Sequence, residues 1–168
     1  NPGPGAEVNP AWTLELARMD RVAYVKESSR DLARVARLIE EIDHGGHARY
    51  FTTVQMLLAS IQLGGSGATM PPPVAYIANA VIAAFKAGNH DEAARLQRQF
   101  GLFPARWMGY GLAPALKAAM EIVGLSLGKP YPPFKAVSGA DFEAMRKYLE
   151  GTYLFEDAHR DIIRSRAA

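Results

Sequence analysis

The stretch Val22-Ala-Tyr-Val-Lys-Glu-Ser-Ser-Arg-Asp31 contains the features that decide the fold. Its first four residues form an apolar run with the length of a buried strand, and Lys26 follows that run directly. Ser28 is a candidate helix N-cap, because Asp31 lies at the capping-box spacing from it. The stretch therefore predicts a strand that ends at a lysine and leads into a helix over about residues 29–42. The three- and four-residue spacing of this helix places five apolar side chains on one face: Leu32, Val35, Leu38, Ile39 and Ile42.

Two more units of the same kind follow within the first 87 residues. The runs Ala48–Thr52 and Ala68–Met70 are predicted strands, and each precedes a predicted helix. Strands that alternate with helices indicate an α/β fold with a parallel sheet and right-handed crossovers. After Gly88 the strands stop, and helices are predicted over Asp91–Phe103, Leu112–Val123 and Ala140–Leu149.

The composition excludes several classes of protein. The 168 residues are 49% hydrophobic and 21% charged, as in a globular domain, and no apolar run is long enough to span a membrane. The net charge of +2 and the scattered arginines argue against a nucleic-acid partner. The lack of cysteine excludes disulfides, thiolate nucleophiles and cysteine-ligated zinc, and it is compatible with a cytoplasmic protein.

Lys26 is the residue with the clearest chemical use. Ligands of parallel α/β folds bind at the carboxyl ends of strands, which is where Lys26 is predicted to lie. A semi-apolar cavity disfavours the charged amine, and a neutral amine can condense with a ketone to give a Schiff base. The alternative interpretation is a lysine at a strand end that extends to solvent. The neighbouring Glu27 is expected to point to the opposite side and to be structural.

Three other patterns suggest sites but have simpler interpretations. His44 and His47 flank two glycines without an evident third ligand, so a solvated loop is predicted instead of a metal site. Gly64–Gly67 lacks the Lys-Ser/Thr of a phosphate-binding loop and predicts a tight turn. Trp107 and its neighbours are predicted to pack in the core, although a place at a site mouth or a subunit contact is an alternative.

The wider pattern around Lys26 resembles a known family. Val25-Lys-Glu-Ser-Ser-Arg-Asp-Leu32, with Leu63-Gly-Gly-Ser-Gly-Ala68 about thirty residues later, is similar to the dihydrodipicolinate synthase / N-acetylneuraminate lyase family. In that family the strand with the Schiff-base lysine reads much like Val-Lys-Glu-Ser-Ser-Gly-Asp. Ala87–Leu96 resembles the helix junction after the family's barrel, and Asn1-Pro2 resembles the end of its Tyr-Asn-x-Pro element.

This resemblance implies the C-terminal portion of a TIM (β/α)8 barrel followed by a three-helix C-terminal extension. Residues 1–87 would supply the last three βα units, and residues 88–168 would form the extension. Lys26 matches the catalytic Schiff-base lysine, and Thr69 matches a position that lines the 2-oxo acid pocket. Thr52 and Thr53, at the end of the strand before Thr69, are further candidates for substrate binding.

The implied activity is that of a Schiff-base lyase on a small 2-oxo acid. The reaction would be aldol cleavage or condensation, or dehydration of a 2-keto-3-deoxy sugar acid or a similar compound, without a metal or organic cofactor. Thr52-Thr-Val54 stands where the synthases have Gly-Asp-Asp, Arg30 stands where the family has Gly, and Gly3–Val8 lacks the synthases' carboxylate-binding arginine. Two alternatives stay open: dihydrodipicolinate synthase proper, and a non-catalytic oligomerisation fragment of the fold.

The resemblance also sets expectations for assembly. A homo-oligomer, either a dimer or a tetramer, is expected. Three parallel strands cannot close a barrel and leave two exposed edges, so the missing N-terminal half of the barrel is expected to come from outside residues 1–168. Those residues alone are not expected to fold, and Asn1 is expected at the same rim of the barrel as Lys26.

Overall fold

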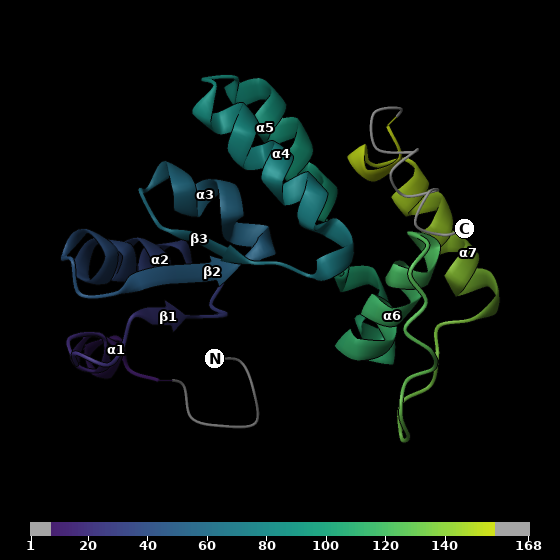
Figure 1. Cartoon of the computed structure of the whole chain (residues 1–168), viewed down its shortest axis with the longest axis horizontal. Coiled ribbons are helices and arrows are strands. Elements are labelled where there is room, and N and C mark those ends of the chain that lie inside the picture. Colours follow the sequence, from purple (N-terminus) through teal and green to yellow (C-terminus); the bar gives the residue numbers. More distant parts are fainter. Residues whose placement is uncertain (1–7, 157–168) are drawn as a thin grey trace. The chain divides into compact units, whose positions relative to one another are not determined.

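The computed structural model describes residues 8–156, which form two compact units (Figure 1). Within the described residues, the first unit comprises residues 8–70 and 85–88, and the second comprises residues 71–84 and 89–156. Most of the helix that follows the third strand groups with the later helices. The expectation for Asn1 lies outside the described residues.

The first unit contains a parallel sheet and the helices between its strands (Figure 1). Its strands are β1 (Tyr24–Lys26), β2 (Arg49–Thr53) and β3 (Gly67–Thr69). Its helices are α1 (Pro10–Ala17), α2 (Leu32–Leu38), which continues as a π-helix (Ile39–His44), and α3 (Leu57–Gln62). The strands pair in the order β1-β2-β3, and both pairs are parallel. The predicted α/β class and parallel strands are confirmed, with slightly different strand limits.

The start of α2 differs from the prediction. Asp31 is the N-cap, because its Oδ1 accepts hydrogen bonds from the backbone N–H groups of Ala33 at 2.9 Å and Arg34 at 3.4 Å. Ser28 lies in the non-helical segment before the helix, so the prediction that it caps α2 was wrong. The pattern was ambiguous because Ser-x-x-Asp fits a capping box, whereas aspartate is itself among the best N-caps.

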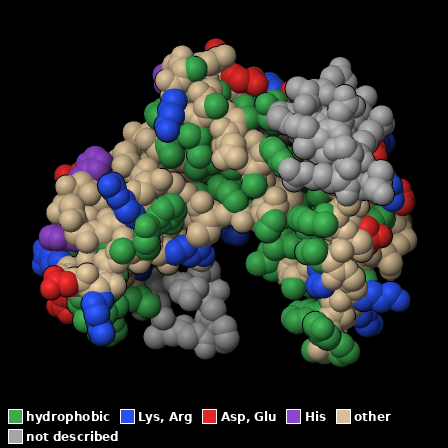
Figure 2. All heavy atoms as spheres, in the orientation of Figure 1, with side chains coloured by type: hydrophobic (Ala, Val, Ile, Leu, Met, Phe, Trp, Pro, Cys, Tyr) green, Lys and Arg blue, Asp and Glu red, His purple; other side chains and the backbone are tan. Residues whose placement is uncertain are grey.

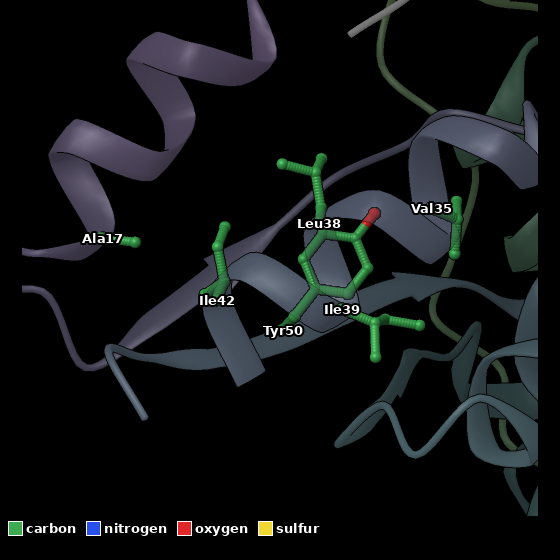
Figure 3. Close-up of a cluster of buried hydrophobic side chains, with 6 residues drawn as sticks. All are labelled: Ala17, Val35, Leu38, Ile39, Ile42 and Tyr50. Atoms are coloured by element: carbon green, nitrogen blue, oxygen red, sulfur yellow. The ribbon is translucent and has the colours of Figure 1, made fainter. Parts of the chain in front are cut away.

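The core of the first unit lies between the sheet and its helices. Tyr50 of β2 is completely buried, and its ring lies among side chains of α1, α2 and the π-helix (Figure 3). Those side chains are Ala17, Val35, Leu38, Ile39 and Ile42. Four of them belong to the helix face that the three- and four-residue spacing predicted. Leu32, the fifth predicted member of that face, is 52% exposed in the first turn of α2.

Asp43 near the end of the π-helix ties the amino ends of two strands together. One of its carboxylate oxygens, Oδ2, accepts hydrogen bonds from the N–H groups of Tyr50 at 3.2 Å and Ser66 at 2.7 Å. The other, Oδ1, accepts one from the Ser66 hydroxyl at 2.9 Å and lies 3.7 Å from Arg49 Nη1. Since the Asp43 side chain is only 4% exposed, these contacts fix the π-helix against β2 and the turn before β3.

The second unit is helical and has its own core. It contains most of α4 (Ala75–Lys86) and the helices α5 (His90–Gln97), α6 (Leu112–Ile122) and α7 (Gly139–Glu150). Trp107 is 2% exposed, contacts the rings of Phe103 and Tyr148, and donates a hydrogen bond from Nε1 to the carbonyl of Asp141. The prediction of core packing for Trp107 is confirmed. None of the helices within residues 8–156 is long and apolar enough to cross a lipid bilayer.

Candidate active site

Lys26 is the last residue of β1, and the alternation of the strand sets the direction of its side chain. Val25 packs against the core around Tyr50, so Tyr24 and Lys26 project from the other face of the sheet. The ring of Tyr24 contacts the ring of Phe51 at 6.0 Å between centroids, which places Phe51 on this face as well. We call this the open face, because its residues Tyr24 and Lys26 are exposed.

Ser28 is the hydrogen-bond partner of the Lys26 amine. Lys26 Nζ lies 2.5 Å from Ser28 Oγ. The backbone between the two residues is held to the sheet, because the N–H of Glu27 donates to the carbonyl of Phe51 at 3.0 Å. Within the described residues Lys26 has no acidic partner, so its amine is oriented by a hydroxyl and not by a carboxylate.

The hydroxyls of Thr53 and Thr69 lie on the same face as Lys26. Thr53 follows Phe51 by two residues and is paired in register with Thr69 of β3. Thr69 Oγ1 donates a weak hydrogen bond of 3.4 Å to the carbonyl of Thr52. Thr53 Oγ1 is buried and has no hydrogen-bond partner in the part of the chain that the structure describes. The two hydroxyls and Lys26 therefore lie near the carboxyl ends of adjacent strands.

Thr52 is not brought together with the other three residues. It alternates with Thr53 along β2, so its side chain projects toward the helices, and the residue is completely buried. Its Oγ1 has no hydrogen-bond partner among residues 8–156. The sequence could not separate the two adjacent threonines without the register of the strand, because a shift of one residue exchanges the faces.

Glu27 and Arg34 support the site from the helix side of the sheet. Glu27 is buried, and its Oε1 accepts a hydrogen bond from Arg34 Nε at 2.5 Å. Arg34 also donates from Nη2 to the carbonyl of Val8 at 2.5 Å. The structural interpretation of Glu27 is confirmed. Arg34 was missed, because an arginine in an amphipathic helix normally reaches solvent and nothing in the sequence marks this one as buried.

His44 is the last residue of the π-helix, and His47 lies in the segment between that helix and β2. His44 Nδ1 lies 3.3 Å from Glu40 Oε2, and His47 Nε2 accepts a hydrogen bond from Arg18 Nε at 3.4 Å. Both histidines are exposed. Among residues 8–156, no group of three or more His, Asp or Glu residues is arranged to hold a metal ion.

The fold and this arrangement define a class: a parallel α/β protein with a lysine amine at the carboxyl end of a strand. Residues 3–151 match the family model described as the Dihydrodipicolinate synthetase family. The chain belongs to this family, as the resemblance predicted.

Individual relatives agree with this assignment. A 4-hydroxy-tetrahydrodipicolinate synthase from Synechococcus sp. (strain JA-2-3B'a(2-13)) is 28% identical over 149 residues, which cover 87% of this chain and 48% of that protein. The chain spans about half the length of the curated relatives it matches.

Solved structures show the same partial coverage. A putative dihydrodipicolinate synthase from Thermus thermophilus has a TM-score of 0.73 and 27% identity, covering 91% of this chain and 53% of that chain. YagE, a prophage protein of the dihydrodipicolinic acid synthase family from E. coli K12 in complex with pyruvate, has a TM-score of 0.73. Its identity is 17%, and the match covers 84% of this chain and 50% of that chain, so it shows a shared fold.

Proposed function

We propose that the complete protein is a Schiff-base lyase that binds a small 2-oxo acid covalently at Lys26. The observation that carries this proposal is the position of Lys26 at the carboxyl end of β1, on the open face with Thr53 and Thr69. An amine there can attack the ketone carbon, and the resulting imine is an electron sink for breaking or making a C–C or C–O bond. The neighbouring hydroxyls can donate hydrogen bonds to the substrate carboxylate.

The same proposal extends to the fold. We infer that β1, β2 and β3 are the last three strands of a (β/α)8 barrel, with residues 1–87 in the barrel and residues 88–168 in a helical extension. Within the described residues β1 and β3 each pair only with β2, so each has one unpaired edge. Trp12, Leu16 and Met19 lie at helical spacing on or just after α1 and are at least 50% exposed. A preceding βα unit would pair with β1 and cover these residues.

Borohydride trapping tests the imine. The complete protein, incubated with pyruvate or a longer 2-oxo acid and then reduced, should carry a stable adduct on the peptide that contains Lys26. Lys26→Ala should remove the adduct and lower turnover by at least about 1,000-fold, since covalent catalysis is lost. Lys86→Ala is a matched control, because Lys86 is an exposed lysine at the end of α4. An adduct on another lysine, or full turnover by Lys26→Ala, would sink the assignment.

We propose a sugar acid or a hydroxy acid as the substrate that forms the imine. Thr52-Thr-Val54 in place of Gly-Asp-Asp, and the lack of arginine in Gly3–Val8, favour a sugar-acid or hydroxy-acid substrate. The second candidate is 4-hydroxy-tetrahydrodipicolinate synthesis, which is favoured by the names of the curated relatives. Steady-state assays with pyruvate plus aspartate semialdehyde, and with 2-keto-3-deoxy sugar acids, decide between them. If borohydride traps no 2-oxo acid on the complete protein, the alternative of a non-catalytic oligomerisation fragment is favoured.

We also propose that the complete protein is a cytoplasmic homo-oligomer, either a dimer or a tetramer, and the family resemblance supports this. Light scattering of the complete protein at micromolar concentration should give a mass of two or four protomers.

A further inference from the structure

The polar side chains of the segment after β1 have two different roles: Ser29 and Asp31 bond to the backbone, and Ser28 contacts Lys26. Ser29 Oγ accepts a hydrogen bond from the N–H of Asp31 at 3.1 Å, and Asp31 caps α2. These two residues therefore satisfy the backbone of the turn. The hydroxyl of Ser28 takes no part in the turn or the cap, and it contacts Lys26 Nζ at 2.5 Å instead.

The position of Ser28 in the chain favours this contact. Residues two apart in an extended segment project to the same side, so Ser28 is placed on the side of the Lys26 amine. Among residues 8–156, Ser28 is the sole hydrogen-bond partner of Lys26 Nζ. Thr53 and Thr69 share the open face, but neither hydroxyl is bonded to the amine.

We propose that Ser28 is a proton-transfer residue for imine formation, and that it also holds the Lys26 amine in position. This inference rests on the proposed function. It assigns a task to a side chain that belongs to this chain and already touches the reacting nitrogen.

The proposed step conserves atoms and charge. Lys26 Nζ forms a bond to the ketone carbon of the 2-oxo acid, and the electron pair of the C=O π bond moves to the oxygen. Ser28 Oγ accepts a proton from the nitrogen while its own proton passes to that oxygen, so Ser28 is unchanged. A second proton, from solvent, then converts the hydroxyl to water. The C–O bond breaks as the nitrogen lone pair forms the C=N bond, so the products are water and a protonated imine that carries the charge of the added proton. A hydroxyl within hydrogen-bond distance of the nitrogen is suitably placed for such a transfer.

Three variants of the complete protein test the role of the hydroxyl. Ser28→Ala removes it, Ser28→Thr keeps it, and Ser29→Ala removes a neighbouring hydroxyl that serves the turn. Borohydride trapping with pyruvate gives the rate of imine formation, and steady-state kinetics give kcat and KM separately. For Ser28→Ala we expect both the trapping rate and kcat to fall about 10- to 100-fold, with KM changed less than about threefold. Ser28→Thr and Ser29→Ala should stay within about threefold of the unaltered protein.

Each result bears on the inference directly. Ser28→Ala that traps at the unaltered rate overturns it, as does a slow Ser28→Thr whose thermal unfolding is unchanged. If Ser28→Ala fails to fold, Ser28→Gly supplies a second variant without the hydroxyl and is judged by the same rates. A lack of any Lys26 adduct in the unaltered protein refutes the proposed function itself. Normal trapping in both the unaltered protein and Ser28→Ala refutes only the role of Ser28.

Discussion

At the scale of single residues, the buried hydroxyl of Tyr50 has a measurable thermodynamic effect. Tyr50 is fully buried, and its hydroxyl has no hydrogen-bond partner among residues 8–156. An unsatisfied buried hydroxyl costs about 1–3 kcal/mol, so Tyr50→Phe should raise the free energy of unfolding by about 1 kcal/mol. Urea unfolding of the complete protein measures this change. Tyr148→Phe is the control, because it removes a hydroxyl that donates to the carbonyl of Gln99 and should destabilise the protein.

We expect Tyr50 to make the free energy of unfolding depend on pH above 10. Burial raises the pKa of Tyr50 well above its usual value of 10, and the nearby Glu27 carboxylate raises it further. Above pH 10 the unfolded chain loses this proton while the folded protein keeps it, so the unfolded state binds fewer protons. The free energy of unfolding should therefore fall as pH rises above 10, and it should fall less steeply in Tyr50→Phe. Equal slopes for both proteins would show that Tyr50 does not cause the loss.

At the scale of elements, the Asp43 side chain connects the π-helix to β2 and to the turn before β3. Its carboxylate accepts hydrogen bonds from Tyr50, near the amino end of β2, and from Ser66, in the turn before β3. Asp43→Ala would leave these donors without their acceptor, and we expect a loss of about 3 kcal/mol in the free energy of unfolding. Glu40→Ala is the matched control, because Glu40 is an exposed acid of the same π-helix and should change stability by less than about 0.5 kcal/mol. Equal effects of the two substitutions would contradict the assigned role.

The sequence predicted the elements better than the contacts between them. Apolar runs and helical spacing identified the strands, the main helices and the core around Leu38 and Ile42, because periodicity reports which side of an element is buried. Asp43 could not be distinguished from Glu40 and Glu41, since all three belong to one acidic run before Gly45. Its role depends on Ser66, which is distant in the sequence and is brought close only by the parallel pairing of β2 with β3.

In the candidate site, too, the sequence predicted single residues better than the contacts between them. The sequence predicted a catalytic role for Lys26 from its place after an apolar strand and from the family-like motif around it, and that role stays a prediction. The exclusion of Thr52 and the bond from Lys26 to Ser28 needed the strand register and the loop conformation. The sequence assigned Ser28 to helix capping, where Asp31 competes with it and forms the observed hydrogen bonds.

At the scale of the whole molecule, the unpaired edges of β1 and β3 determine how the described sheet behaves alone. Hydrophobic side chains also reach the surface of the molecule (Figure 2), and Trp12 and Tyr24 of the first unit are 60% and 70% exposed. We expect residues 1–168, produced separately, to aggregate or to exchange their amide hydrogens rapidly in β1 and β3. Adding the segment that completes the barrel should slow exchange in β1. A monomer of residues 1–168 that unfolds cooperatively would refute the half-barrel proposal.

The Asp43 contacts lie at the amino ends of β2 and β3, whereas Lys26, Thr53 and Thr69 lie at the carboxyl ends of the strands. An evolving lineage can therefore exchange side chains at one rim of the sheet while the anchoring contacts at the other rim persist. Directed evolution can use the same separation. A library that varies Thr53, Thr69 and the exposed Arg30, with Lys26, Ser28 and Ser29 kept, should sample new substrate ranges with few unfolded members. A library at Asp43 and Ser66 should yield mostly misfolded protein and little new catalysis.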